Sequence, residues 1–214
     1  EEVDWSVGQV LDTIRQEGLA ENTLVLFTTD NGPAGGLTAG PLRGRKGSSF
    51  EGGQRVPTVV WWPGTIPAGS QIDALTTAMD LHPTFAKLAS AKMPLDRVID
   101  GRDISPILLG ESGTKTPHDR FFYQQGGRLA AVRSGDWKLF LNGQLYNLRK
   151  DLKESKNVAS RYPGVVKRLQ GLLNEFRRDL SQNSRPVGID KNSRTLVPRP
   201  GAKGEDAYRP TLSI

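Results

Sequence analysis

The sequence of 214 residues contains no cysteine. Disulfide bonds, zinc–thiolate sites and a cysteine nucleophile are therefore excluded within these residues. No apolar run approaches the ~20 residues that a membrane-spanning helix needs, so we expect no membrane partner. Residues 1–5 (EEVDW) lack the features of a signal peptide and lead directly into a helical pattern. We therefore expect the sequence to start inside a longer protein.

Motifs for two common phosphate-bearing partners are also missing. Residues 44–48 (GRKGS) break the nucleotide-binding pattern G-x-x-x-x-G-K-[ST]. No nucleic-acid-binding motif and no regular basic–aromatic pattern occurs, so we expect no nucleic-acid partner. The net charge of +6 fits an acidic substrate such as a sulfated or phosphorylated glycan. By charge alone nucleic acid fits equally well, and a basic surface without a specific partner is the more common explanation.

The composition favours a globular chain with many turns. Hydrophobic residues make up 36% and charged residues 24% of the chain, which is long enough to bury one sizeable core. The 24 glycines and 14 prolines indicate frequent turns and long loops.

The first half of the chain has the pattern of an α/β unit. Apolar residues in the range 2–17 follow a 3.6-residue period, which predicts an amphipathic helix. The run Leu-Val-Leu-Phe at residues 24–27 predicts a strand buried on both faces, typical of a parallel sheet. A second strand is expected at residues 59–62, and a helix with Asp80 as N-cap through residue 89. Helix, short loop and buried strand indicate the α/β class.

The second half has the pattern of a small antiparallel sheet covered by a helix. Four short apolar segments follow one another, and an Asn-Gly turn signal at residues 142–143 separates the last two. These strand candidates are residues 121–123, 129–132, 137–141 and 144–148. Pro163 opens a helix whose apolar stripe, ending at Leu180, should pack on the sheet. We predict three regions: an α/β part (1–115), a sheet-plus-helix subdomain (116–180) and an extended basic tail (181–214).

Chemically informative residues follow the first predicted strand. Asp30 and Asn31 supply two hard oxygen ligands, and Lys46 lies in a glycine-rich segment between Gly44 and Gly47. Together they suit a site for a divalent metal and an anionic ester. The intervening range 33–55 shows no strand or helix pattern, and a loop that long is usually functional. The simpler alternatives are an Asx turn at residues 30–31 and a solvated surface lysine.

Two further features have less specific interpretations. Glu51 and Arg55 are four residues apart around two glycines, and we favour a structural ion pair that shapes the loop. His118, which follows Pro117 before a predicted strand, is a candidate substrate-binding residue, although a lone loop histidine more often has no such role.

Seven segments of the chain carry a further signal through their order: LVLFTTDNG (24–32), LRGRKG (42–47), EGGQRVP (51–57), WPGTIPAG (62–69), DLHPT (80–84), DGRDISP (100–106) and LYNL (145–148). In this order they resemble the type I sulfatases, the arylsulfatase-like members of the alkaline phosphatase superfamily. The resemblance extends over residues 3–180.

The resemblance implies a fold and a mechanism. The fold would be the end of a mostly parallel, sandwich-type α/β sulfatase domain, followed by the small sheet and helix. Asp30 and Asn31 are implied calcium ligands, and Lys46 is the implied electrostatic stabiliser of the sulfuryl group. The implied nucleophile is a hydrated formylglycine made from Cys or Ser in a Cys/Ser-x-Pro-x-Arg motif, which is absent here.

The resemblance together with the absence of this motif predicts that the chain is the carboxyl-terminal portion of a sulfatase. The expected partners are the amino-terminal part of the same sulfatase, which would supply the formylglycine and most calcium ligands, and a sulfated small molecule or glycan. We expect the parent protein to be a periplasmic or secreted sulfuric ester hydrolase, and these residues alone to be inactive. The alternatives are a phosphodiesterase or phosphonate monoester hydrolase of the same superfamily, and a non-catalytic polyanion-binding protein.

Overall fold

A computed structural model describes residues 1–183 of the chain. The chain divides into two compact units, Glu1–Leu173 and Asn174–Ile214, and only residues 174–183 of the second are described. The predicted basic tail therefore lies outside the described residues, apart from residues 181–183, which belong to the last helix. No helix within residues 1–183 is both long and apolar enough to cross a membrane.

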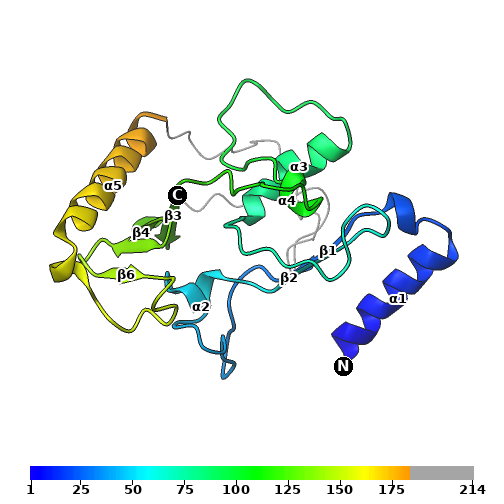
Figure 1. Ribbon diagram of the computed structural model, residues 1–214, viewed down its shortest axis with the longest axis horizontal. Coiled ribbons are helices and arrows are strands. Elements are labelled where there is room, and N and C mark those ends of the chain that lie inside the picture. The colour runs from blue at the N-terminus through cyan, green and yellow to red at the C-terminus, as the bar shows by residue number, and fades with distance from the viewer. Residues whose placement is uncertain (184–214) are drawn as a thin grey trace, which may run out of the picture. The chain divides into compact units, whose positions relative to one another are not determined.

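The first elements are helix α1 (Glu2–Gln16), a 3₁₀ turn (Ala20–Asn22) and strand β1 (Val25–Thr28). Strand β1 pairs with β2 (Thr58–Trp61) in an antiparallel two-stranded sheet (Figure 1). The predicted helix and strands are confirmed, but the prediction of a parallel, doubly buried strand is wrong for the described residues. The end of β1 is exposed, because a four-residue apolar run reveals neither the direction of its neighbour nor how many of its faces are covered.

The short helix α2 (Glu51–Gln54) lies between β1 and β2 in the chain. A 3₁₀ turn (Ala78–Asp80), α3 (Leu81–Leu88) and α4 (Ser105–Leu108) lie between β2 and the second sheet. The expectation of no helix in residues 33–55 is wrong at α2, a single turn with two glycines that no periodicity could reveal. A small core forms where Ile104, Ile107 and Leu108 pack near Val60.

The second sheet confirms the predicted antiparallel arrangement. Strands β3 (Phe121–Gln125), β4 (Arg128–Ser134), β5 (Trp137–Phe140) and β6 (Leu145–Asn147) are ordered β3-β4-β5-β6, and every neighbouring pair is antiparallel. Gly143 lies in the turn between β5 and β6 with φ of 84°, a left-handed conformation that explains the Asn-Gly signal there.

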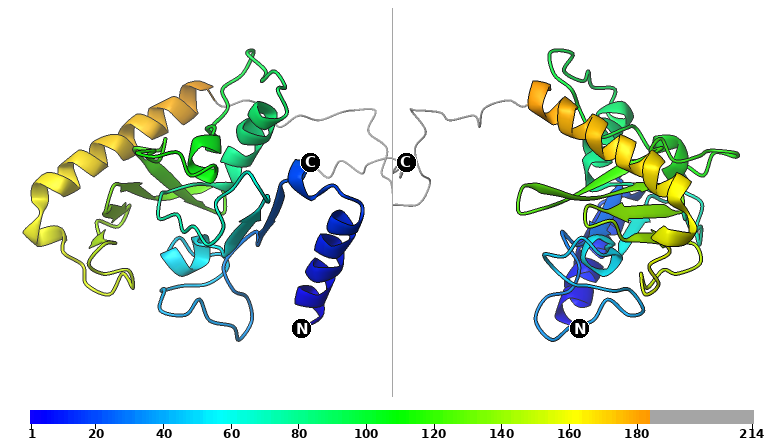
Figure 2. Two further views of the ribbon diagram at one scale, coloured as in Figure 1. Left: turned by 45° about the vertical axis from the view of Figure 1, so that its right-hand side comes forward. Right: turned by 90° about the vertical axis from the view of Figure 1, so that its left-hand side faces the viewer.

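One face of this sheet is covered by the first part of helix α5 (Pro163–Asn183), as Figures 1 and 2 show. Leu169 and Leu173 are fully buried against Val132, Leu139 and Leu145. Full burial of such a side chain contributes about 1.5–3 kcal/mol. The helix and its apolar stripe are therefore confirmed, and the helix extends to Asn183.

The other face of the sheet receives the glycine-rich segment that precedes α2. Tyr123, Ala131, Phe140 and Tyr146 form a second buried cluster, and Phe50 packs against it with its ring centroid 4.9 Å from that of Phe140. Alternate residues of the strands thus serve two different surfaces, the helix on one side and the loop on the other.

Candidate active site

The turn that follows β1 is held by close backbone packing. The main-chain N–H of Gly32 donates to the Gly53 carbonyl at 3.2 Å. A Cβ atom added to Gly32 would lie only 2.0 Å from the Gly52 carbonyl oxygen. Only glycine permits this approach, so the Asp30–Asn31 turn and helix α2 are joined through their backbones.

The loop carrying Lys46 is joined to the same turn. The Lys46 N–H donates to the Pro33 carbonyl at 2.9 Å. Gly44 and Gly47, on either side of it, have φ of 91° and 84°, which other residues rarely adopt. The main chain at Lys46 is thereby fixed beside the Asp30–Asn31 turn, and the Lys46 side chain is exposed.

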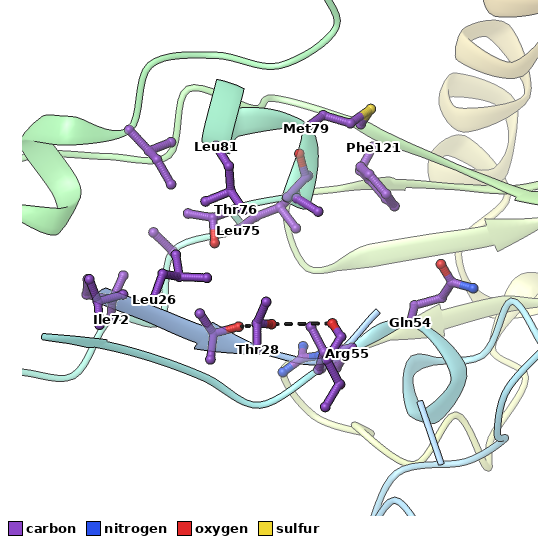
Figure 3. A pocket seen from close by; sticks show the side chains of 18 of the residues that line it. Leu26, Thr28, Gln54, Arg55, Ile72, Leu75, Thr76, Met79, Leu81 and Phe121 are labelled. Atoms are coloured by element: carbon purple, nitrogen blue, oxygen red, sulfur yellow. Dashed lines mark hydrogen bonds between the residues drawn. The ribbon is translucent and has the colours of Figure 1, made fainter. Parts of the chain in front are cut away.

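A pocket of about 510 Å³ opens between the β1–β2 pair and the segment before α3 (Figure 3). One part of its wall is apolar and includes Leu26 and Val60. The polar part includes Asp30, Arg55 and Arg133. The pocket thus combines a carboxylate at the end of β1 with two guanidinium groups, whereas Lys46 and His118 are not among its lining residues.

Asp30 and Asn31 offer oxygen atoms suited to a hard cation. The Asp30 carboxylate is exposed and makes no hydrogen bond or ion pair within the described residues. The Asn31 Nδ2 donates to the Gly32 carbonyl at 2.8 Å, which leaves the amide oxygen as the group for a metal. Within residues 1–183, no group of three or more His, Cys, Asp or Glu residues could hold a metal ion. This donor chemistry fits calcium, but the two residues supply only a fraction of the ~6–8 oxygens it takes.

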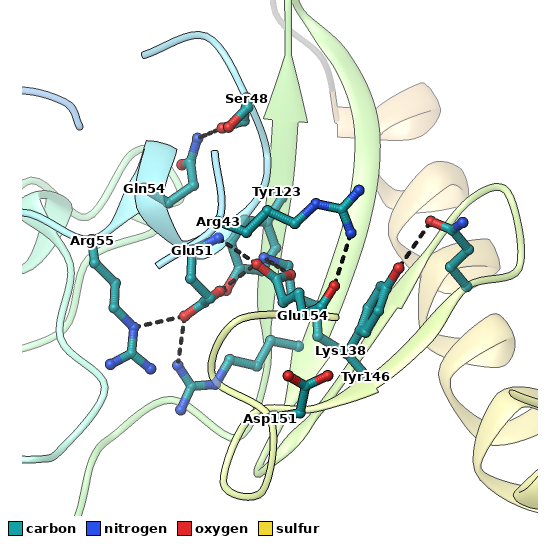
Figure 4. A network of polar contacts seen from close by, with 12 residues as sticks. Arg43, Ser48, Glu51, Gln54, Arg55, Tyr123, Lys138, Tyr146, Asp151 and Glu154 are labelled. Carbon is teal, nitrogen blue, oxygen red and sulfur yellow. Dashed lines mark hydrogen bonds and ion pairs between the residues drawn. The ribbon is translucent and has the colours of Figure 1, made fainter. Parts of the chain in front are cut away.

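A buried network of charged side chains (Figure 4) shares Glu51, Arg55 and Tyr123 with the wall of the pocket. The Lys138 ammonium is 2.8 Å from Glu51 Oε1 and 2.9 Å from Glu154 Oε1, and all three side chains are at most 1% exposed. Glu51 also accepts hydrogen bonds from the Tyr123 hydroxyl at 2.9 Å and from Arg55 Nε at 2.7 Å. The predicted Glu51–Arg55 pair is therefore confirmed, as one part of a larger network.

The network shifts the pKa values of its acids in opposite directions. Burial raises the pKa of Glu51, but the Lys138 charge and the hydrogen bonds from Lys138, Arg55 and Tyr123 outweigh it and lower the pKa to about 2. Burial raises the pKa of Glu154, and Lys138 only partly compensates. Burial and the adjacent Glu51 charge raise the pKa of the Tyr123 phenol. Glu51 is therefore the carboxylate that stays ionised most firmly.

His118 does not line the pocket and contacts Asp80 instead. Its Nε2 atom lies 2.9 Å from both carboxylate oxygens of Asp80, which is fully buried. Asp80 also accepts hydrogen bonds from the main-chain N–H groups of Thr77 and Arg102. Asp80 begins α3 as predicted, but its side chain joins three segments and does not cap that helix. This placement favours a structural role for His118, and its substrate contact stays a prediction.

Comparison with known proteins finds similarity to sulfatases. The sulfatase family model matches residues 1–91. Rat steryl-sulfatase is 44% identical over 156 residues, which cover 65% of this chain and 27% of the relative. Dog N-acetylgalactosamine-6-sulfatase is 43% identical over 143 residues, covering 64% of this chain and 27% of the relative.

Residues 1–91 of this chain therefore match the sulfatase family, and the relatives that extend beyond this range are sulfatases too. The chain matches the carboxyl-terminal portion of sulfatases and spans about a quarter of the length of the curated relatives, 27% in both cases above. A solved Bacteroides thetaiotaomicron structure, described in terms of the metabolism of multiple glycosaminoglycans, is similar with a TM-score of 0.73 and 29% identity. That similarity covers 82% of this chain and 43% of the other. The α/β fold class is thereby confirmed.

In this sulfatase-like chain, the residues predicted to form a site are only partly brought together. The backbone of Lys46 lies beside the turn of Asp30 and Asn31, whereas His118 contacts Asp80. Sequence reasoning missed Lys138 and Glu154. A lysine inside the apolar run Trp-Lys-Leu-Phe of a predicted strand was the available signal. Glu154 lies in an irregular segment whose pattern gives no such signal.

Proposed function

We propose that the chain is the carboxyl-terminal portion of a sulfatase that hydrolyses sulfate esters, with Asp30 and Asn31 as calcium ligands and Lys46 as a sulfate-binding cation. The observation that carries this proposal is the pair of backbone hydrogen bonds, Gly32 to Gly53 and Lys46 to Pro33, that joins the turn to the lysine loop. These bonds bring the backbones of two oxygen ligands and a lysine into one neighbourhood.

The proposed roles follow from the chemistry of the side chains. The Asp30 carboxylate and the Asn31 amide oxygen hold part of the calcium shell, and the bound ion would balance the negative charge of the sulfate oxygens. The Lys46 ammonium, on a flexible stem, donates charge-assisted hydrogen bonds to the sulfuryl group. A cation in this position stabilises charge that develops as the ester bond breaks.

The nucleophile has to come from elsewhere, because the chain contains no cysteine and none of its serines precedes x-Pro-x-Arg. We propose that an amino-terminal sulfatase part supplies a formylglycine and the remaining calcium ligands. That part is the proposed protein partner, and residues 1–214 alone are expected to be inactive because sulfuryl transfer needs a positioned nucleophile.

The proposed substrate is a sulfated carbohydrate or an aryl sulfate. The names of the relatives above, a steryl-sulfatase and an N-acetylgalactosamine-6-sulfatase, support a sulfate ester as the substrate. The net charge of +6 favours such an anionic ligand. We propose a periplasmic or secreted location, where such esters are accessible.

The test is the turnover of two chromogenic substrates by the complete protein, in which this chain follows its amino-terminal part. We expect calcium-dependent cleavage of an aryl sulfate, and no measurable turnover by residues 1–214 alone. Faster cleavage of an aryl phosphodiester than of the sulfate would overturn the proposed reaction. Calcium-independent binding of a sulfated glycan without turnover would instead favour the polyanion-binding alternative.

A further inference from the structure

The Lys46 loop rests on the small antiparallel sheet through a buried ionic contact that no role in sulfate hydrolysis yet explains. Lys138 on β5 bridges Glu51, the first residue of α2, and Glu154, which follows β6. Its side chain is completely buried, and its ammonium lies 4.0 Å from the centre of the Tyr123 ring. An ammonium buried between two carboxylates is costly unless its partners are held in place, so the geometry of all three is coupled.

Glu154 holds both ends of the loop that contains Lys46. Its Oε2 atom accepts the main-chain N–H of Glu51 at 2.7 Å, and its main-chain carbonyl accepts from Arg43 Nη1 at 2.8 Å. Glu154 has φ of 51°, a left-handed conformation that is uncommon outside glycine. The surrounding contacts therefore fix this residue in a conformation that it would not adopt by preference.

The loop between Arg43 and Glu51 is held by one hydrogen bond that links its two ends and by another to the sheet. The Gly52 N–H donates to the Arg43 carbonyl at 2.7 Å. On the outer side, Gln125 Nε2 of β3 donates to the Gly47 carbonyl, one residue after Lys46, at 2.6 Å. A path of contacts therefore leads from Lys138, through Glu51 and Gly52, to the segment that presents Lys46.

We propose that Lys138 is a positioning residue for Lys46: shared by Glu51 and Glu154, it holds the Lys46 loop on the small sheet in the geometry needed to contact the sulfate. This inference rests on the proposed sulfatase function. It gives the sheet-plus-helix subdomain a task in the reaction, because the loop that carries the cation is anchored there.

The first experiment measures hydrogen exchange in residues 1–214, without any catalysis. In Lys138→Met, which removes the charge but keeps a long side chain, we expect peptides covering residues 43–53 to exchange at least about tenfold faster. Peptides covering Leu169–Leu173 of α5 should keep their protection. The exposed Lys150→Met is the matched control and should change neither region. Unchanged protection of residues 43–53, or an equal loss in α5, would overturn the proposal.

Glu154→Gln is the second variant, in case Lys138→Met does not fold. The glutamine keeps the side-chain shape and an acceptor for the Glu51 N–H but loses the charge that faces Lys138. We expect a folded protein with faster exchange confined to residues 43–53. A folded Glu154→Gln variant with wild-type exchange in this range would contradict the proposal.

The second experiment is a double-mutant cycle in the complete sulfatase. Lys138→Met should lower kcat/KM for an aryl sulfate about 10- to 100-fold, as expected for a small displacement of a catalytic group. In a Lys46→Ala background the same change should cost less than about twofold, because the group being positioned is gone. Equal losses in both backgrounds would overturn the positioning role. A Lys46→Ala variant with wild-type kcat/KM would instead refute the proposed function, whatever the exchange experiment shows.

Discussion

The main-chain N–H of Lys46 donates to the carbonyl of Pro33 at 2.9 Å. Pro33 follows Asp30, Asn31 and Gly32 directly, so this bond fixes the spacing between the proposed metal ligands and the loop that carries the proposed sulfate-binding cation. The turn after β1 and the loop around Lys46 are therefore held at a fixed distance by a hydrogen bond between their backbones. The bond fixes the main chain from which the Lys46 side chain extends, and the side chain itself is exposed.

The close backbone packing of Gly32 against Gly52 also holds the turn after β1 in place, and the Gly32→Ala variant tests this contact. The new Cβ would meet the Gly52 carbonyl oxygen at 2.0 Å, so backbone has to move. We expect a loss of about 1–3 kcal/mol in the free energy of unfolding, measured by urea denaturation. Gly36→Ala is the matched control, since nothing lies within 4 Å of its added Cβ and it should be neutral or slightly stabilising. Equal stability of the two variants would show that the contact is not tight.

The isolated chain should bind calcium weakly. Asp30 and Asn31 leave most of the ~6–8 oxygen positions to water, so a calorimetric titration of residues 1–214 should show no saturation below about 1 mM calcium. In the complete sulfatase, Asp30→Ala should lower calcium affinity and activity together. Micromolar binding by the isolated chain would mean that residues 1–214 contain a site other than the one proposed.

The Glu51 carboxylate should make stability depend on pH. Its pKa is lowered from 4.5 to about 2 in the folded protein, so its stabilising effect is complete above pH 4.5 and is lost as the pH falls toward 2. A shift of this size corresponds to about 3 kcal/mol. Urea unfolding of the wild type and Glu51→Gln should therefore differ most at pH 7, and the difference should shrink steadily below pH 4.5. A difference that is constant from pH 7 to pH 3 would refute this assignment.

The His118→Ala variant tests whether the contact between His118 and Asp80 is structural. Removing one donor from a buried carboxylate costs about 1–3 kcal/mol, so His118→Ala should lower the free energy of unfolding by that amount. In the complete sulfatase, KM for an aryl sulfate should stay unchanged. A several-fold rise in KM without a loss of stability would restore the role in substrate binding that the sequence suggested.

The parts of the fold that the sequence predicted correctly are those with strong local signals. The 3.6-residue stripe of α5 and the Asn142-Gly143 turn each specify a structure within a few residues of chain. The neighbour of β1 depends on segments far away in sequence, and the prediction of a parallel sheet was wrong for the described residues. Motifs located Asp30 and Lys46, but the contact between Lys138 and Glu154 needs the folded chain, because nothing in the sequence pairs a strand with an irregular segment.

The central claim, that Lys46 acts on the sulfuryl group, is tested most directly by kcat for a chromogenic aryl sulfate in the complete sulfatase. Lys46→Ala should lower kcat by about 10²–10³-fold, as the loss of one oxyanion donor does. Arg45→Ala is the matched control, since both side chains are exposed on the same loop, and it should change kcat by less than about threefold. Equal losses in the two variants, or a rise in KM alone for Lys46→Ala, would contradict the claim and indicate that the loop acts only as a basic surface that gathers substrate.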